Sequence, residues 1–186
     1  VLNESHSFCL DVKNSLKICS PSAALATSEG VKTYKTSDQL IELLKIEEGF
    51  CKYPVWDYRQ YTVGYGTCCP SDKVAYYSAN GISTYEAEQL LRNYLTNSEN
   101  AINNKLIKKY NLNMTQNQFD ALLSFSYNCG TGWIYTESSE FRSAIINGAT
   151  GNEIIDRFSR WCNAGGQIKT FLLKRRLCEA NMYLNG

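Results

Sequence analysis

The chain has 186 residues, a formal net charge of +1, and hydrophobic residues at 44% of its positions. This length fits one domain with an extension, or two small lobes that share a core. The apolar content excludes an intrinsically disordered protein. The small net charge argues against a nucleic-acid-binding protein, which usually has a dominant basic surface. No apolar run approaches the roughly 18 residues that a membrane-spanning helix needs. We therefore expect neither a nucleic-acid partner nor a membrane span.

Charged residues cluster tightly at one place, Lys174-Arg175-Arg176. A solvated helix face is the favoured interpretation of this cluster. The alternative is a patch that faces an anionic polymer such as a cell wall.

Eight cysteines are the strongest compositional anomaly. Their spacing lacks the repeated short pairs of a zinc site, and only one histidine is available to help. An even number in a chain of this size is typical of disulfides formed in an oxidising compartment. We expect four disulfides and a secreted, extracellular protein, and the start at Val1 rather than Met favours a processed product. Cys9 with Cys19 is the favoured local pair, but the connectivity stays open among Cys9, Cys19, Cys51, Cys68, Cys69, Cys129, Cys162 and Cys178.

Periodicity divides the chain into an extension and one domain. Residues 1–36 lack sustained periodicity and are expected to form an extension pinned by a disulfide, followed by a domain over 37–186. A helix is predicted to start at Thr36–Gln39, with a capping box from Thr36 to Gln39, and to stop at Gly49. Its apolar stripe is Leu40, Ile41, Leu43 and Leu44.

A change of pattern after this helix predicts a small sheet. Aromatic and β-branched residues over 53–67, separated by glycines, predict short antiparallel strands. Ser83 and Glu86 form a second capping box, from which a long helix should start. Further helices are predicted over Thr115–Asn128, Ser138–Asn147, Asn152–Asn163 and Thr170–Leu184. The fold class is therefore α+β, predominantly helical.

Candidate catalytic carboxylates occur in two different settings, at the end of the first predicted helix and in the aromatic segment that follows it. Glu47 and Glu48 both fall near the edge of the apolar stripe at the helix end, and periodicity does not choose between them. A half-buried carboxyl group there could hold a proton near neutrality, although a solvated glutamate is the usual occupant of a helix end. Asp57 lies between two aromatic residues, where either a sugar contact or an Asx-turn fits. Thr62 could hold a nucleophilic water, or be an ordinary strand threonine.

The sequence lacks the residues that other hydrolytic mechanisms require. His6 is the only histidine and lies in the extension, so a catalytic triad or a Cys-His pair would have to use it. No phosphate-binding glycine loop follows the pattern that such loops require. Two carboxylates in different environments are instead what glycosidic hydrolysis uses.

These residues recur in a known family. The chain resembles the phage-type lysozymes of glycoside hydrolase family 24, from about Ser37 to the C-terminus. Four blocks in the family's order carry the resemblance: Glu48-Gly49 with Tyr53, Asp57 and Tyr61-Thr62-Val63-Gly64-Tyr65-Gly66-Thr67; Ile82-Ser83 through Ala87-Glu88-Gln89-Leu90-Leu91; Gln118-Phe119-Asp120-Ala121-Leu122 through Ser126-Tyr127-Asn128-Cys129-Gly130; and Arg160-Trp161 with Gly165-Gly166 and Lys174-Arg175-Arg176.

The resemblance implies a two-lobed lysozyme-like fold and assigns roles that periodicity left open. The family's acid is the glutamate directly before glycine, here Glu48. Its second carboxylate corresponds to Asp57 and its water-positioning threonine to Thr62. The implied activity is inverting, endo-acting hydrolysis of the β-1,4 bond between N-acetylmuramic acid and N-acetylglucosamine in bacterial peptidoglycan, by a monomer without a cofactor. The substrate would lie in a cleft between the two lobes. The long helix that starts at Ser83 would join these lobes.

Two departures from the family keep alternatives open. The segment between Asp57 and Thr62 is one residue shorter than in many members and lacks glycine, and Thr67 stands where many members have histidine. A non-catalytic glycan-binding or inhibitory protein with a lysozyme fold is therefore the second hypothesis. A preference for N-acetylglucosamine polymers, as in chitinases, is the third.

Overall fold

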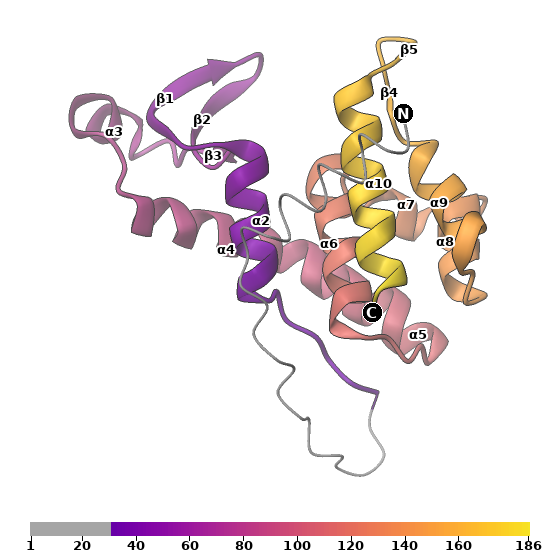
Figure 1. Cartoon of the computed structure of the whole chain (residues 1–186). Coiled ribbons are helices and arrows are strands. Elements are labelled where there is room, and N and C mark those ends of the chain that lie inside the picture. The colour runs from indigo at the N-terminus through magenta and orange to yellow at the C-terminus, as the bar shows by residue number, and fades with distance from the viewer. Residues whose placement is uncertain (1–30) are drawn as a thin grey trace. The chain divides into compact units, whose positions relative to one another are not determined.

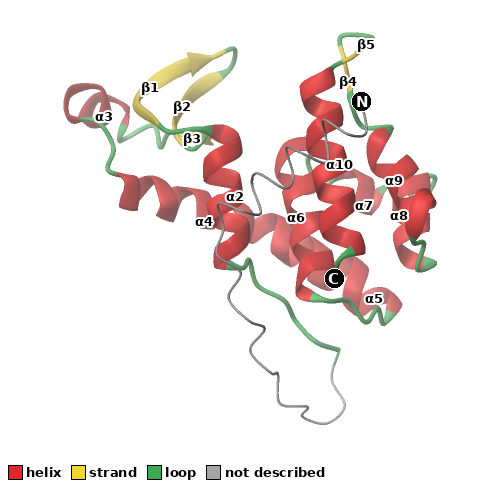
Figure 2. Ribbon diagram, viewed as in Figure 1, coloured by secondary structure: helices red, strands yellow, loops and turns green. Residues whose placement is uncertain are grey.

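The computed structural model describes residues 31–186, which form two compact units (Figure 1). The sheet unit spans residues 36–99 and carries a three-stranded antiparallel sheet. The helical unit comprises residues 31–35 and 100–186, and its only strands among the described residues are two very short ones (Figure 2). The predicted class, α+β with a small antiparallel sheet and mostly helix, is confirmed. Within residues 31–186, no helix has both the length and the apolar character to cross a membrane.

Helix α2 (Asp38–Glu48) opens the sheet unit. Its N-cap is Ser37, whose Oγ accepts a hydrogen bond from the Leu40 amide at 3.1 Å. The predicted cap at Thr36 is wrong, because the Thr36 amide and hydroxyl both donate to the Glu99 carboxylate instead. The helix buries Leu40, Ile41 and Leu44 and ends at Gly49, as predicted, with φ +69°.

The sheet follows directly and has the strand order β1-β2-β3. Its strands are β1 (Cys51–Asp57), β2 (Gln60–Gly64) and β3 (Thr67–Cys68). Helix α3 (Val74–Asn80) comes next, and α4 (Thr84–Ala101) completes the unit. The predicted capping box at the start of α4 is confirmed, since the Glu86 amide donates to Ser83 Oγ and the Ser83 amide donates to the Glu86 carboxylate, both at 3.1 Å.

The boundary between the two units lies inside α4, so the main segment of the helical unit begins at Asn100, near the end of that helix. After α4 the chain runs through a π-helical segment, η1 (Ile102–Ile107), and α5 (Lys108–Tyr110). Five further helices and one short hairpin complete the unit: α6 (Gln116–Cys129), α7 (Gly132–Tyr135), α8 (Glu140–Ile146), α9 (Gly151–Ser159), β4 (Asn163–Ala164), β5 (Gln167–Ile168) and α10 (Thr170–Leu184). Helix α10 packs against α6 and α9.

Aromatic rings fill the core of the helical unit. Phe125 of α6 lies 4.4 Å from Phe141 of α8 and 5.5 Å from Phe158 of α9, measured between ring centroids. Tyr34, which the sequence assigns to the extension, is a core residue here. Its ring stacks on Phe119, and its backbone exchanges two hydrogen bonds with the Asn103 side chain.

The basic cluster before the C-terminus is not an exposed patch. Arg176 is completely buried and forms an ion pair with buried Glu179, from Nε to Oε2 at 2.7 Å. Arg175 also reaches Glu179, at 3.4 Å. Both sequence-based interpretations of this cluster are therefore wrong for Arg176, because a carboxylate one helical turn away compensates its charge inside the core.

Candidate functional site

Glu48 is the last residue of α2, directly before the glycine that ends the helix. The Gly49 amide donates to the Lys45 carbonyl at 3.1 Å, which closes the last turn and fixes the backbone beside the carboxylate. Glu47 and Glu48 are both half-buried. Burial therefore distinguishes these two glutamates no better than periodicity does.

Ion pairs hold this end of α2 against α4. Lys45, one turn before Glu48, pairs with Glu88 of α4, and Arg92 bridges Glu88 and Asp38, each at 2.8 Å. Hydrogen bonds from Lys45 and Arg92 lower the pKa of Glu88 below its ordinary value of 4.5. The charged network and buried Leu44 together fix the position of the helix end that carries Glu48.

Asp57 is the last residue of β1, at the tip of a tight hairpin. It is directly opposite Gln60 of β2, so only Tyr58 and Arg59 form the turn. Tyr58 has φ +53°, and the Arg59 amide donates to the Asp57 carbonyl across it. A bulky side chain is uncommon in this left-handed region, and that of Tyr58 is 93% exposed. The shortened segment thus closes without glycine by holding a tyrosine in a conformation that costs free energy.

The strand register places Asp57 and Thr62 on one face of the sheet. Thr62 is directly opposite Val55, and Asp57 is two residues beyond Val55 on the same strand. Directly opposite residues share a face, as do residues two apart. The Thr62 hydroxyl donates to the Val55 carbonyl at 3.4 Å, a long hydrogen bond. The two sheet residues predicted to act on water therefore project from the same surface.

Gln60 also belongs to this face, and the sequence analysis missed it. Directly opposite residues have Cβ atoms about 4.5–5.5 Å apart, so the Gln60 amide lies within reach of the Asp57 carboxylate. A two-residue turn fixes this pairing once the strand ends are known. The short spacing between Asp57 and Thr62 was thus the sequence signal from which the position of Gln60 opposite Asp57 could have been predicted.

The opposite face of the sheet carries two buried residues, and the end of strand β2 approaches α4 at Gly64. Val63 and Thr67 are buried there, and Trp56 and Tyr61 form an edge-to-face pair with centroids 5.1 Å apart. A Cβ atom at Gly64 would lie 2.7 Å from the Ala87 Cβ atom. Only glycine allows this approach of strand to helix, and the approach fixes the sheet that carries Asp57 and Thr62.

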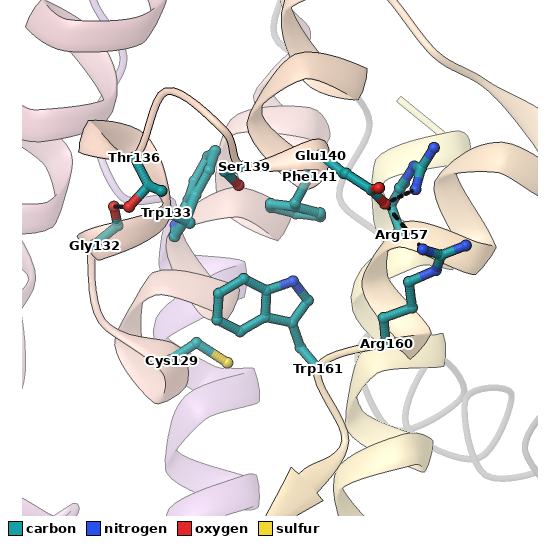
Figure 3. Close-up of a pocket in the computed structure, with 10 residues that line it drawn as sticks. All are labelled: Cys129, Gly132, Trp133, Thr136, Ser139, Glu140, Phe141, Arg157, Arg160 and Trp161. Atoms are coloured by element: carbon teal, nitrogen blue, oxygen red, sulfur yellow. Dashed lines mark hydrogen bonds and ion pairs between the residues drawn. The ribbon is translucent and has the colours of Figure 1, made fainter.

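The helical unit contains a cavity of about 430 Å³ that the sequence analysis did not predict (Figure 3). Three aromatic rings line it, those of Trp133, Phe141 and Trp161, and Figure 3 shows Glu140, Arg157 and Arg160 together at one side. The sequence named Arg160 and Trp161 only as part of a family block. The other lining residues come from four separate helices, α6 to α9, so no local pattern reveals the cavity.

Of the six described cysteines, only Cys178 is disulfide-bonded. Cys51, Cys68, Cys69, Cys129 and Cys162 are free thiols, so the prediction that all eight cysteines are paired is wrong. Cys178 is not among these free thiols, and Cys9 and Cys19 lie outside the described residues.

The sheet order explains part of this correction. Cys51 of β1 and Cys68 of β3 flank β2, so two strand spacings separate them, about 9.5 Å. Disulfides need Cα atoms within about 7 Å. Adjacent Cys68 and Cys69 differ in environment, since Cys68 is exposed and Cys69 is buried.

Comparison with known proteins gives consistent results. The phage lysozyme family matches residues 45–179. Endolysins of Bacillus phage B103 and Bacillus phage PZA are 34% and 31% identical to the chain, each over 69% of its length. The chain spans only 44% and 45% of these two relatives.

Solved structures with a similar fold cover more of the chain. A mutant of P22 lysozyme has a TM-score of 0.68 at 26% identity, covering 81% of this chain and 99% of its own. The muramidase domain of SpmX from Asticaccaulis excentricus has a TM-score of 0.66 at 26% identity, covering 81% and 98%. Because the family match extends over well more than half of the residues, the chain belongs to the phage lysozyme family.

Proposed function

We propose that this protein is a muramidase that hydrolyses bacterial peptidoglycan at the β-1,4 bond between N-acetylmuramic acid and N-acetylglucosamine. One observation carries the proposal beyond family membership. Asp57 and Thr62 share one face of the sheet, and the helix that ends at Glu48 leads directly into that sheet. A proton donor and a water-holding pair are what inverting glycoside hydrolysis requires.

Each residue has a defined task in this mechanism. Glu48, half-buried at the helix end, protonates the oxygen of the leaving sugar. Asp57 accepts a proton from the attacking water or stabilises the positive charge that develops on the sugar. The Thr62 hydroxyl orients this water, and its long bond to Val55 leaves it readily available. Inversion then requires the Glu48 and Asp57 carboxyl groups to be about 6.5–9.5 Å apart in the substrate complex.

Matched substitutions of the two adjacent glutamates test the acid. Glu48→Gln should keep the fold and reduce clearance of bacterial walls by about 10²–10⁴-fold, because the general acid is lost. Glu47→Gln, equally half-buried one residue earlier, should lose far less. Turbidity clearance together with thermal unfolding measures both. Similar losses in the two variants would contradict the assignment to Glu48.

The stereochemistry of the first product tests the mechanism. An inverting enzyme releases the α-anomer from a β-linked glycan, which NMR detects before mutarotation. Asp57→Asn and Thr62→Val should lower the rate without changing this outcome. A β-anomer as the first product would contradict the roles of Asp57 and Thr62 and would indicate a covalent intermediate.

The hairpin supports a second candidate, a glycan-binding protein without catalysis. Tyr58 closes the turn at φ +53°, where many family members have a glycine-containing loop, and this places Asp57 at the extreme tip. A binder would clear no walls as wild type or as Glu48→Gln, yet would sediment with them. Reducing-end analysis of digests of walls and of chitin would separate a muramidase from an enzyme that prefers N-acetylglucosamine polymers.

We also propose that the enzyme acts outside the cell as a secreted antimicrobial protein. The large cysteine content supports a role in an oxidising environment, but the five free thiols do not add to that support. Native alkylation should label exposed Cys51 and Cys68 before buried Cys69 and Cys162. A fully oxidised protein, lighter by about eight hydrogens and unreactive to alkylation, would restore the four-disulfide framework.

A further inference from the structure

The cavity of the helical unit combines an aromatic wall with a compact ion cluster. Trp133 and Phe141 are buried, whereas Trp161 is 38% exposed and presents part of its indole to solvent. Edge-to-face contacts with Phe125 at 5.2 Å and with Phe141 at 6.4 Å hold the Trp161 ring in place. The cavity is of the size that small-molecule sites have, about 300–1,000 Å³. It therefore offers a fixed, partly open aromatic surface.

The ion cluster at the side of the cavity combines charges of both signs. The Glu140 carboxylate accepts from both Arg157 and Arg160, the latter at 2.9 Å. Arg160 also pairs with Asp156 at 2.9 Å. Arg157 Nε is buried and has no hydrogen-bond partner among the described residues. Arg157 also pairs with Glu153 at 3.9 Å. Two guanidinium groups and three carboxylates thus offer hydrogen-bond donors and acceptors of both charge signs.

These mixed charges restrict the kind of ligand that the cavity can bind. A free anion would be opposed by Glu140 and Asp156, and a cation by Arg157 and Arg160. An apolar ligand would leave these polar groups without partners. A neutral sugar ring fits all of these constraints, because its C–H face packs on an aromatic ring while its equatorial hydroxyls both donate and accept.

We propose that this cavity binds a neutral N-acetylated hexosamine of a wall glycan, stacked on Trp161 and hydrogen-bonded to Glu140 and Arg160. The choice of sugar rests on the proposed function, but the cavity is separate in residues from Glu48, Asp57 and Thr62. It would hold the enzyme on polymeric substrate without taking part in bond cleavage.

The three tryptophans of the chain allow a direct test, because Trp56 lies in the sheet unit whereas Trp133 and Trp161 lie in the helical unit. Uniformly ¹⁵N-labelled Glu48→Gln protein should be titrated with the N-acetylglucosamine tetramer while the three indole N–H signals are followed. Trp→Phe variants assign the signals. We expect the Trp161 signal to shift saturably.

Variants that remove one charge at a time then locate the binding groups without removing the aromatic core. Glu140→Gln and Arg160→Gln should each raise the Kd measured at Trp161 by about tenfold, the cost of losing one charged hydrogen bond. Glu137→Gln, an exposed residue in the preceding loop that does not line this cavity, is the control and should not change it.

The possible outcomes separate this inference from the proposed function. A static Trp161 signal overturns the inference, whether Trp56 shifts or not, and leaves the muramidase proposal standing if wild type clears walls. Equal Kd values in all three variants also overturn it, because the shift would then arise elsewhere. Saturable Trp161 binding that weakens in Glu140→Gln, in a protein that clears no walls, would support the cavity and contradict the muramidase.

Discussion

The two units of this member of the phage lysozyme family differ in where they place their polar side chains. The sheet unit displays it at the surface: no residue of β1 is fully buried, and Asp57 projects from an exposed hairpin tip. The helical unit encloses it: α6 buries an unbroken run from Phe119 to Ser126, and an ion pair lies inside the core. Carboxylates are therefore exposed on the sheet, whereas among the helices a carboxylate compensates a buried charge inside the core.

The comparison teaches how an exposed hairpin can still be positioned well. The hairpin buries few residues of its own, so the position of the hairpin depends on a few contacts at its base. These are the approach of Gly64 to Ala87 and the charged network that joins α2 to α4. Changes at the base should impair activity, whereas changes in the core of the helical unit should impair stability first.

The largest effect on stability is expected at the buried ion pair. Glu179→Gln leaves the completely buried Arg176 guanidinium without a compensating charge, and the Ser124 hydroxyl loses a strong acceptor. Removing one member of such a pair costs about 3–5 kcal/mol of unfolding free energy. Urea denaturation measures it.

Two further variants sharpen this result. The double variant Arg176→Met/Glu179→Leu should lose less than Glu179→Gln alone, because the completely buried guanidinium of Arg176 is removed together with its partner. Glu153→Gln, in a surface pair with Arg157 at 3.9 Å, should change the unfolding free energy by less than about 0.5 kcal/mol. A loss at Glu179 as small as at Glu153 would show that the pair does not support the core.

A substitution at the base of the sheet should have the next largest effect. Gly64→Ala places a Cβ atom 2.7 Å from the Ala87 Cβ atom and forces alanine to φ +67°, at a cost of about 1–3 kcal/mol. The displaced strand should also lower wall clearance, because Thr62 lies two residues earlier. Gly148→Ala has a similar φ of +69° with no atom within 4 Å and reports the backbone cost alone. Equal losses in both variants would mean that the contact with Ala87 is unimportant.

Much of the fold could be predicted from local patterns because its helix ends carry their own signals. The Ser83–Glu86 box, the Gly49 stop and the bounds of α10 are all confirmed. The prediction fails where a distant residue competes for a local group, as when Glu99 takes the Thr36 hydrogen bonds. It also fails at Asn163, where a predicted helix gives way to the β4–β5 hairpin around Gly165.

In the candidate site, too, residues close together in the sequence could be predicted, whereas residues brought together by packing could not. Glu48, Asp57 and Thr62 lie within fifteen residues of one another, and their roles, carried over from the family, stay predictions. Gln60 needed the strand register, and the cavity around Trp161 needed the packing of separate helices. The cysteines were misread because their number says nothing about the distances between them.

The face that carries Asp57 can be tested by adding a charge to it. Gln60→Glu places a second carboxylate directly opposite Asp57, and like charges at this spacing disfavour each other's ionised form. The acid limb of the pH–activity profile should therefore move to higher pH, by less than about one unit. Gln60→Ala should leave that limb in place, as should Gln89→Glu on exposed α4. An unchanged limb in Gln60→Glu would indicate that Asp57 does not control the acid side of the reaction.

The smallest effect is expected at the charged network that joins α2 to α4. Hydrogen bonds from Lys45 and Arg92 lower the pKa of Glu88 below 4.5, so its ionised form is favoured by folding. This contribution is fully present above the unfolded-state value and is lost as the pH falls through the lower folded-state value. Glu88→Gln should therefore cost about 0.5–1 kcal/mol near pH 7, and this deficit should shrink as the pH falls below 4.5, measured by urea denaturation across that range. Glu42→Gln, whose more exposed carboxylate also pairs with Lys45, should lose less at pH 7. If the Glu88→Gln deficit is unchanged in acid, the side chain contributes by packing, and the base of the sheet unit is not held by charge.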